Sequence, residues 1–555
     1  MSTKPHQVSP MRLLVSLLRG ETKEVLVILV YGIGVGVLSL AVPIGIQSLV
    51  NTVTFGSFSQ PVVFLVLTVF FGLSLAAGLR TVQITIVESL QKRFFGQIAL
   101  ELAYRIPRFR LHNTNKQNFP ELVNRFFDVL TVQKSSATLL LEGFALALQI
   151  FFGFILIGFY HWFLLSFAIV MTLAVAAVLF LMGRGAIQTS IEESVQKYRV
   201  AAWLEEIAVR PLLFRSAEAR SMALERADLV LGEYLSAREK HFSILMRQVM
   251  GSLALQAIGS SALLGIGTYL VVKNQLTLGQ LVAAEIVVTT ALASLAKFQK
   301  HLEAYYDLIA ALDKIESLLN VPLERSLGEA PPKKEGPAAI EIRKISFRYK
   351  SGPAVFESLS FIVESGAKVA LRGENASGKT TLVDLLFGIK SPQSGALLYD
   401  GVDYRDFSPE LLRTQVALVR GLEILPGTIF DNVSLGRNYI NADRVRECLN
   451  QVGLLNDVLQ FEEGIHTRLG PDGSPFSVAQ AQALVLARAI AGKPRLLIVD
   501  EALDELDERS RGLAIKVLLD PNAPWTLLLS THSESLAKHF PKVILLDTRR
   551  ERKSA

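Results

Sequence analysis

The chain contains very little cysteine. Cys448 is the only one among 555 residues, so no disulfide framework can form within one chain, and the redox compartment cannot be inferred. Charged residues are also few, at 19% of the composition, and the net charge is only +6. This small excess of Lys and Arg lies beside apolar segments, which favours a membrane protein and argues against a nucleic acid partner.

The first residues lack the apolar core of a cleavable signal peptide. Residues 1–10 contain no apolar run, and residues 11–20 are amphipathic. We therefore expect residues 1–24 to form an interfacial segment that lies on the inner surface of a membrane.

Apolar residues are abundant. Half of the chain is hydrophobic and the mean hydropathy is +0.37, values that are unusual for a soluble protein. Its length also exceeds what a single core accommodates, which predicts at least two domains. Six stretches are long enough to cross a bilayer, which takes about 20 helical residues. They are Val25–Val50, Val62–Val87, Ala137–Tyr160, Trp162–Met182, Val249–Val272 and Leu278–Ala296.

The connections between these stretches alternate in length and charge. The three short ones together contain a single basic residue, Lys273, whereas residues 88–136 contain eight Lys or Arg and residues 183–248 contain ten. Positive residues accumulate on the cytoplasmic side of membrane proteins. The sequence thus predicts a multi-pass protein of the cytoplasmic (inner) membrane, in contact with membrane lipids, with both termini in the cytoplasm.

The two long connections are predicted to be helical hairpins that project into the cytoplasm. Between Glu192 and Lys240 only Pro211 and Gly232 interrupt a composition that favours helix. We expect the hairpin tips at Leu111–Phe119 and Arg210–Ser216.

The composition changes after the sixth stretch. Pro, Gly and charged residues concentrate in residues 319–338, which are predicted to be a linker. Short apolar runs then alternate with helical segments, as in an α/β domain. The expected organisation is a multi-domain chain with an all-α transmembrane domain of six helices (residues 25–318) and an α/β P-loop domain (residues 339–555).

The strongest local motif is a glycine-rich loop. Residues Gly373 to Thr380 read GENASGKT and fit G-x-x-x-x-G-K-[ST], between a predicted strand and a predicted helix. Such loops wrap backbone N–H groups around phosphate oxygens at a helix N-terminus. Lys379 would reach the β- and γ-phosphates, and the Thr380 hydroxyl would hold Mg²⁺. The predicted phosphate-binding residues are Gly373, Glu374, Asn375, Ala376, Ser377, Gly378, Lys379, Thr380 and Thr381.

Two acids follow a second apolar run. Leu496–Val499 precedes Asp500 and Glu501. Such a strand is often only structural, but downstream of a phosphate-binding loop it is the expected partner of that loop. Asp500 would support Mg²⁺, directly or through water, and Glu501 would polarise the attacking water.

The order of these parts resembles an ATP-binding cassette of the exporter class of ABC transporters, over nearly the whole chain. The resemblance implies an ATPase coupled to transport, with ATP and Mg²⁺ as cofactors. It assigns Tyr349 to stacking on adenine, although a core tyrosine of an edge strand is the alternative. It assigns His532 to the γ-phosphate and Asp507 to a loop at a dimer interface. Leu276–Ala283 is similar to the start of the sixth span in bacterial peptide and protein exporters.

Three segments depart from the family pattern. The signature L-S-G-G-Q is replaced by Phe476–Gln480, which reads FSVAQ; Ser477 and Gln480 remain and would bind a nucleotide held by the other subunit, but Val478 could obstruct its approach. The glutamine that the family usually has after the strand Val416–Val419 is missing, and Arg420 begins the shortened segment. Pro471-Asp472-Gly473 replaces the usual Glu-Arg-Gly.

One cassette and six spans make half of a transporter, so the resemblance implies a dimer. A homodimer and a heterodimer with a second half-transporter both remain open. The expected function is export, with peptide or protein substrates and a periplasmic adaptor as one option and lipid or drug export as another. A regulatory subunit with little turnover is the alternative that the altered signature motivates.

Overall fold

The computed structural model describes residues 15, 19–54, 60–110, 123–325, 328–331, 334–349, 352–504 and 506–546, without the side chains of residues 53, 54, 60, 61 and 291–299. The chain divides into two compact units. One contains Met1–Phe109 and Thr114–Pro322, and the other contains Arg110–Asn113 and Leu323–Ala555. We describe each unit by itself.

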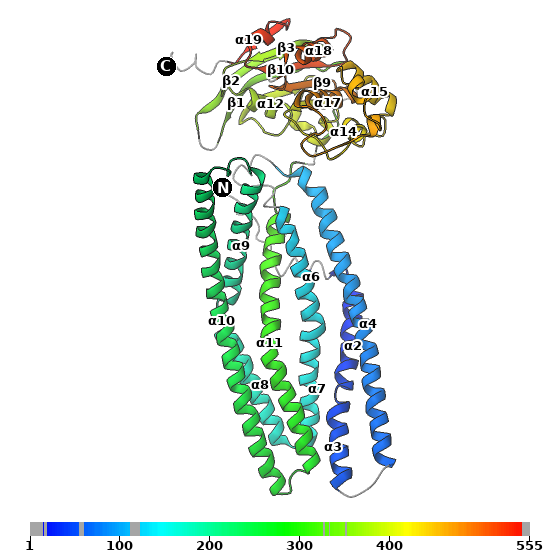
Figure 1. The fold of residues 1–555 in the computed structure, drawn as a ribbon, viewed down its shortest axis with the longest axis vertical. Helices are drawn as coiled ribbons and strands as arrows, with labels where there is room; N and C mark the ends of the chain where they lie inside the picture. The colour runs from blue at the N-terminus through cyan, green and yellow to red at the C-terminus, as the bar shows by residue number, and fades with distance from the viewer. Residues whose placement is uncertain are drawn as a thin grey trace. The chain divides into compact units, whose positions relative to one another are not determined.

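The first unit is built from long helices (Figure 1). Short 3-10 turns at Ile106–Arg108 and Arg125–Phe127 and a π-helical turn at Leu139–Gly143 connect some of them. The helices are α2 (Thr22–Leu38), α3 (Ala41–Thr54), α4 (Gln60–Arg105), α6 (Asp128–Thr138), α7 (Phe144–Tyr160), α8 (Trp162–Met182), α9 (Ala186–Val209), α10 (Ala217–Val272) and α11 (Leu278–Leu319).

Five helical segments of the described residues are long and apolar enough to cross a membrane. They are Thr22–Thr52, Val62–Arg108, Arg125–Tyr160, Trp162–Met182 and Ala217–Val272, and they contain the first five predicted spans. The sixth predicted span, Leu278–Ala296, begins α11. Its described apolar part, Leu278–Thr290, is shorter than the other five segments, and the side chains beyond it lie outside the description.

The first predicted span is divided into α2 and α3. Pro43 lies near the start of α3 and has no backbone N–H to donate to the carbonyl of Ser39, four residues earlier. The Ser39 hydroxyl donates to the carbonyl of Gly36 at 2.6 Å, and the Ser39 N–H closes the end of α2. The proline therefore explains why the helix is interrupted where the sequence predicted one continuous span.

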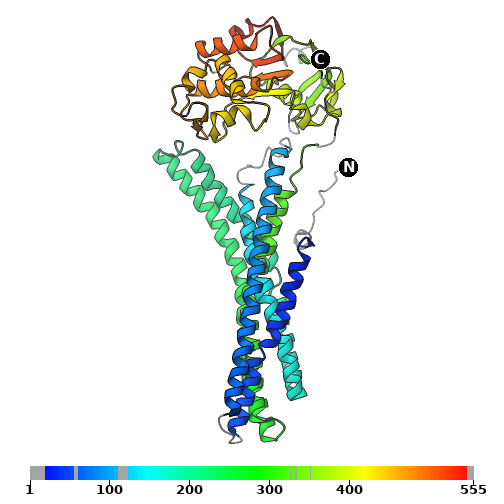
Figure 2. The same ribbon diagram turned by 90° about the vertical axis from the view of Figure 1, so that its right-hand side faces the viewer.

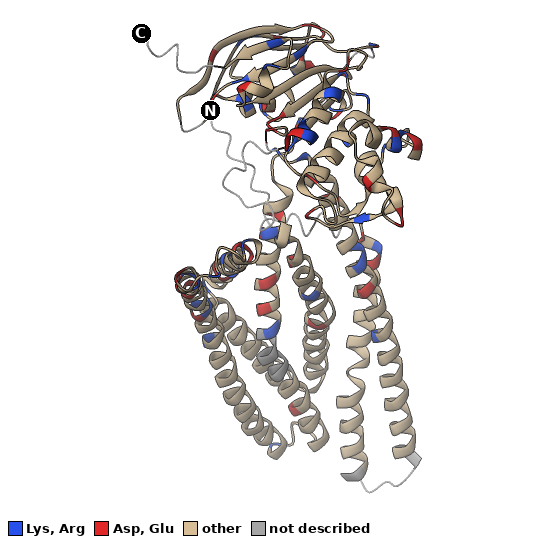
Figure 3. Ribbon diagram, turned by 45° about the horizontal axis from the view of Figure 1, so that its top comes forward, with Lys and Arg blue, Asp and Glu red and all other residues tan. Residues whose placement is uncertain are grey.

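The second hairpin continues directly from the apolar helices. α9 ends at Val209 and α10 begins at Ala217, which confirms the predicted tip at Arg210–Ser216. The 56 residues of α10 are about 84 Å long, whereas the apolar core of a bilayer is about 30 Å thick. Figure 2 shows α9 and α10 running together, and Figure 3 shows charged residues gathered toward the hairpin end of these helices. The other predicted tip, Leu111–Phe119, lies outside the described residues.

The second unit has the predicted α/β fold. A parallel sheet has the strand order β11-β3-β10-β9-β6, and an antiparallel sheet has the order β2-β1-β4-β5. The strands are β1 (Ile340–Arg348), β2 (Ala354–Val363), β3 (Lys368–Arg372), β4 (Ser394–Tyr399), β5 (Val402–Asp403), β6 (Val416–Arg420), β7 (Gly427–Thr428), β8 (Arg468–Leu469), β9 (Leu496–Asp500), β10 (Thr526–Thr531) and β11 (Lys542–Leu545). The helices are α12 (Lys379–Leu386), α13 (Pro409–Leu412), α14 (Ile429–Ser434), α15 (Ala442–Gln451), α16 (Leu455–Val458), α17 (Val478–Ala491), α18 (Glu508–Leu518) and α19 (Glu534–Ala537).

The parallel sheet lies between two apolar layers. Alternate residues of a strand point to opposite faces, so Leu497 and Val499 of β9 pack with the layer that contains α15, α17 and α18. Leu496 and Ile498 pack with the layer of α12 and the antiparallel sheet. Burial on both faces explains why β9 is apolar throughout until Asp500. The first charged residue of this strand therefore emerges at its carboxyl end, where ligands bind in open α/β sheets.

Candidate functional site

The glycine-rich loop joins β3 to α12, as the motif predicted. Gly378 has φ +91°, and a Cβ there would lie 2.6 Å from the Val355 side chain. A Cβ on Gly373 would lie 2.3 Å from the Ser377 hydroxyl, so both positions require glycine. The Ser377 hydroxyl is buried and, among the described residues, has no hydrogen-bond partner. A free buried hydroxyl at the N-terminus of α12 suits a phosphate oxygen.

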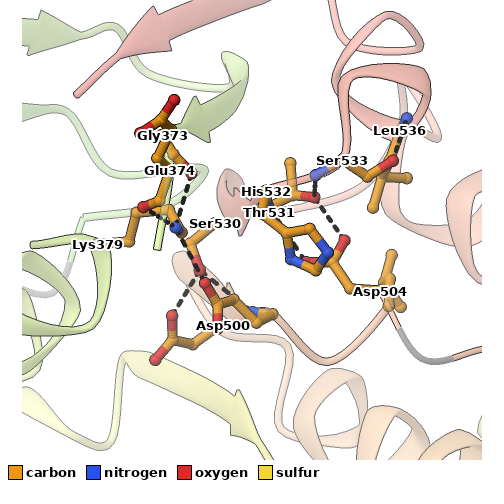
Figure 4. Close-up of polar contacts among 12 residues, drawn as sticks. Gly373, Glu374, Lys379, Asp500, Asp504, Ser530, Thr531, His532, Ser533 and Leu536 are labelled. Carbon is orange, nitrogen blue, oxygen red and sulfur yellow. Dashed lines mark hydrogen bonds and ion pairs between the residues drawn. The ribbon is translucent and has the colours of Figure 1, made fainter. Parts of the chain in front are cut away.

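Lys379 is held inside this loop (Figure 4) and also contacts Glu501. Its Nζ donates to the carbonyls of Gly373 and Glu374 at 2.8 and 3.0 Å, and it lies 3.1 Å from Glu501 Oε1. The Lys379 side chain is 3% exposed, whereas that of Glu501 is 41% exposed. Glu501 has φ +54°, a strained conformation for a residue with a side chain. The turn after β9 thus aims this carboxylate at the phosphate loop.

The ends of two neighbouring strands flank Asp500. The register pairs Asp500 with Ser530 of β10 on one side and with Arg420 of β6 on the other. Asp500 Oδ1 accepts a hydrogen bond from the Ser530 hydroxyl at 2.5 Å, and Oδ2 accepts one from Arg420 Nε at 2.8 Å. Arg420 Nη1 also donates to Asp384 Oδ1 of α12 at 2.7 Å. Burial disfavours the arginine charge, but Asp384 and Asp500 outweigh that effect and raise the pKa of Arg420.

This arrangement fits a magnesium ion poorly. Thr380 and Asp500 are the predicted metal ligands, but both carboxylate oxygens of Asp500 already accept hydrogen bonds, one of them from a cation. A divalent cation at Asp500 would stand beside the positive charge of Arg420, and the repulsion between the two charges disfavours it. Within the parts of the chain that are described, no group of three His, Cys, Asp or Glu residues could hold a metal.

His532 is fixed by an acid that the sequence analysis did not assign to the site. Its Nδ1 lies 2.9 Å from Asp504 Oδ2, and its backbone N–H donates to the same oxygen at 3.3 Å. The Thr531 hydroxyl donates to Asp504 Oδ1 at 2.5 Å. The Asp504 side chain is 3% exposed and that of His532 is 56% exposed, so one edge of the imidazole is anchored while the ring stays accessible (Figure 4). Contact of His532 with a γ-phosphate remains a prediction.

Tyr349 lies against the helix that follows the phosphate loop. Its hydroxyl is 2.9 Å from the Thr381 hydroxyl and accepts a hydrogen bond from Lys390 Nζ at 2.7 Å. Lys390 Nζ is also 4.6 Å from the centre of the tyrosine ring. The structure therefore brings Tyr349 to the predicted nucleotide site as a half-buried residue. Its stacking on adenine remains a prediction.

The signature residues cap a helix. Ser477 accepts a hydrogen bond from the Gln480 N–H, and the Gln480 side chain accepts one from the Ser477 N–H, which forms a capping box at the start of α17. Gln480 Nε2 also donates to Asp457 Oδ2 at 2.9 Å. The Val478 side chain is 61% exposed on the first turn. Both retained residues thus have a structural role that is independent of any nucleotide.

The predicted site residues fall into two groups. Ser477, Gln480 and Asp507 line a cavity of about 420 Å³, and none of its described lining residues belongs to the phosphate loop. Asp507 caps α18 by accepting the N–H groups of Arg509 and Ser510, and these hydrogen bonds, that of Ser510 first, lower its pKa. Lys379, Asp500 and Glu501 form the other group, which lies around the phosphate loop.

No sequence motif marks the residues that hold Asp500, Arg420 and His532 in place. These are Asp384, Ser530 and Asp504, and Arg420 was noted only as part of a segment without glutamine. One signal was available for Arg420. It directly follows a predicted strand, and parallel strands end at the same edge of a sheet, where Asp500 also emerges.

A glycine-rich loop after β3, two acids at the end of β9 and a histidine after β10 are arranged as in an ATP-binding cassette of the ABC type. The same chain contains a helical unit with several apolar helices, and this combination is similar to the architecture of ABC exporter half-transporters. Residues 356–504 match the sequence model of the family described as ABC transporter.

The chain is similar to curated bacterial proteins that are named for toxin translocation. It is 27% identical over 326 residues to the alpha-hemolysin translocation ATP-binding protein HlyB of Escherichia coli, which covers 58% of this chain and 45% of that protein. It is 26% identical over 326 residues, with the same coverage, to the leukotoxin translocation ATP-binding protein LktB of Mannheimia glucosida. The matched region thus spans less than half the length of these relatives.

The fold as a whole is similar to a solved exporter structure. A bacterial Atm1-family ABC exporter with ATP bound matches with a TM-score of 0.82 and 18% sequence identity, over 96% of this chain and 94% of that chain. At this identity the likeness establishes the exporter fold of the chain.

Proposed function

We propose that this chain is one half of an ATP-driven exporter in the cytoplasmic membrane. The observation that carries the proposal is the arrangement of Lys379, Glu501 and His532 around a phosphate loop, in a chain whose described residues also include five apolar helices of membrane-spanning length. Lys379 holds Glu501 in this structure, and a phosphate bound at Lys379 would compete for the ammonium group. Nucleotide binding would thereby release the Glu501 carboxylate to orient the attacking water.

The substrate we favour is a peptide or protein. Two observations support this choice: the segment Leu276–Ala283 resembles peptide and protein exporters, and the relatives are named for the translocation of an alpha-hemolysin and of a leukotoxin. A periplasmic adaptor would then be a partner. Lipid or drug export is the alternative substrate class.

The cassette is proposed to work as a dimer. Ser477 and Gln480 line a cavity that, in the described residues, shares no lining residue with the phosphate loop. A nucleotide at Lys379 would therefore meet the signature helix of another subunit. We favour a homodimer, since the residues around the phosphate loop are retained, and a second half-transporter with an unaltered signature is the alternative.

The test of the proposal is the ATPase rate of the purified full chain in lipid. We expect the wild-type rate to exceed those of Glu501→Gln and Lys379→Ala by on the order of 100-fold, because each variant removes a group that acts on the transferred phosphate. Binding of a fluorescent ATP analogue to Glu501→Gln would show that this variant retains the nucleotide site. A wild-type rate no higher than that of either variant would contradict the motor function of a homodimer.

A low-turnover regulatory subunit is the second candidate. The exposed Val478 at the start of α17 and the Arg420 guanidinium on Asp500 favour it, because both alter groups that would contact nucleotide or metal. This candidate predicts ATP binding without turnover by the chain alone, and turnover only when a second half-transporter is present.

A further inference from the structure

The positive charge at Asp500 is supplied by the chain itself. Arg420 bridges Asp500 and Asp384, with nitrogen–oxygen distances of 2.8 and 2.7 Å. Both acids are buried, with 5% and 6% of their surface exposed. The register of β6 against β9 places Arg420 directly opposite Asp500, so this contact is built into the sheet.

The third nitrogen of this guanidinium lacks a partner among the described residues. Arg420 Nη2 is buried and has no hydrogen-bond partner in the described portion of the chain. A buried donor without a partner is unfavourable, so a ligand that accepts its hydrogen bond is favoured. Guanidinium groups match phosphate oxygens in charge and geometry. The phosphate loop after β3 and Arg420 at the end of β6 lie along the same edge of one parallel sheet.

We infer that Arg420 takes the place of a divalent cation, so that this site binds a nucleoside triphosphate without magnesium. A metal ion at such a site neutralises phosphate charge and is held by the carboxylate after β9. Here the carboxylate already holds a guanidinium, which carries its charge at every physiological pH. The inference rests on the proposed function, since it concerns the same nucleotide site.

The experiment compares nucleotide binding with and without metal. The full chain in detergent is titrated with a fluorescent methylanthraniloyl derivative of ATP, once in excess EDTA and once in excess magnesium. We expect wild-type dissociation constants that agree within about threefold between the two media, a difference below 1 kcal/mol. This readout is binding and does not depend on catalytic turnover.

Two substitutions at Arg420 separate its charge from its shape. Arg420→Gln should weaken binding in EDTA by about tenfold and restore a requirement for magnesium, because Asp500 is then free to hold the ion. Arg420→Lys should bind more weakly than wild type but remain independent of magnesium, because the charge remains.

Arg495→Gln is the matched control. Arg495 forms a similar buried ion pair, with Asp400 at 2.7 Å, but it precedes β9 and so lies at the opposite end of this strand from Asp500. Binding in EDTA and in magnesium should stay equal in this variant. Thermal unfolding of each variant shows whether it is folded before its binding is compared.

The outcomes distinguish this inference from the proposal on which it rests. Wild-type binding that requires magnesium would contradict the inference that Arg420 replaces the divalent cation. It would still be consistent with a nucleotide site at the phosphate loop. No saturable binding in either medium would contradict the nucleotide site itself. If Arg420→Gln does not fold, the wild-type comparison alone decides.

Discussion

At the scale of single residues, Asp504 controls how His532 is presented. The acid is buried and accepts three hydrogen bonds or ion pairs from consecutive residues: the Thr531 hydroxyl, the His532 N–H and the His532 ring. Because Asp504 Oδ2 holds Nδ1, the other ring nitrogen is the one that remains to meet a ligand. The orientation of this histidine therefore depends on an acid 28 residues earlier.

We predict that Asp504→Ala lowers the ATPase rate by about tenfold, because His532 loses the partner that orients its ring. The measurement is the steady-state rate of the purified chain together with its dependence on ATP concentration. A positioning role should reduce the maximal rate more than the apparent affinity. Asp504→Asn keeps an acceptor for the ring and should recover part of the rate.

Asp443→Asn is the control for this comparison. Its side chain is 88% exposed and pairs with Arg446 on the surface of α15. Its ATPase rate should equal that of the wild type. A wild-type rate in Asp504→Ala, with the variant folded, would show that the contact with His532 has no part in turnover.

At the scale of elements, neighbouring residues at the start of α17 have different roles: two of them cap the helix, and two others lie where a nucleotide would approach. Ser477 and Gln480 form the capping box, whereas Val478 and Ala479 stand where the family has two glycines. The side chain of Val478 is exposed and would obstruct a nucleotide that approaches the helix N-terminus. Removing these side chains should therefore open the helix start while its cap stays intact.

We predict that the double variant Val478→Gly, Ala479→Gly raises the ATPase rate several-fold. Glycines inside a helix destabilise it by about 1 kcal/mol each, so thermal unfolding is measured alongside. Ser477→Ala is the contrasting variant, and we expect it to destabilise the protein by about 1 kcal/mol through loss of the cap. An unchanged rate in a folded double variant would mean that the two side chains do not limit turnover.

The elements themselves could be predicted where one physical rule dominates. The predicted strands Val416–Val419 and Leu496–Val499 correspond to β6 and β9. Burial on both faces makes β9 apolar throughout, and such a run can be recognised in the sequence. The predicted hairpin tip at Arg210–Ser216 also agrees with the structure. The interruption of the first span was missed, since its apolar pattern continues through Pro43.

The contacts between side chains in the site were less predictable than the motif residues themselves. Motif spacing indicated Lys379, Asp500 and Glu501, and the structure places them around one loop. The contact of Arg420 with Asp500 depends on which strands are neighbours, and β6 and β9 are far apart in the sequence. The same holds for Asp504 and His532. Pairings of this kind follow from the tertiary fold and have no local sequence signal.

At the scale of the whole molecule, the predicted orientation can be tested with thiol chemistry because the chain has one native cysteine. Cys448 is fully buried, and burial raises the pKa of its thiol to about 11. Little of it is the reactive thiolate at neutral pH, so the folded wild-type chain should not be labelled by maleimides. Each introduced cysteine then reports its own position.

We predict opposite labelling for two exposed sites in the helical unit. Asn274→Cys lies in the short connection between α10 and α11 and should react with a membrane-impermeant maleimide added to intact cells. Leu212→Cys lies at the tip between α9 and α10 and should react only after the cells are permeabilised. Accessibility in the reverse order would contradict the orientation inferred from the basic residues.

In a homodimer of this chain, the two ATP sites could depend on each other for hydrolysis, and this dependence can be measured. In a homodimer, each phosphate loop would face the signature helix of the other copy, so one inactive subunit should impair both sites. If both sites must turn over, the ATPase rate falls with the square of the wild-type fraction when wild type is mixed with Glu501→Gln. An equal mixture should retain roughly a quarter of the rate, whereas independent subunits would retain roughly half. The two chains are co-expressed with different affinity tags, and sequential purification isolates the mixed dimer. Its rate should be close to zero if both sites must turn over, and about half of the wild-type rate if the subunits are independent. Failure to recover any mixed dimer, with each chain folded and active only beside another half-transporter, would contradict the homodimer and favour a heterodimer.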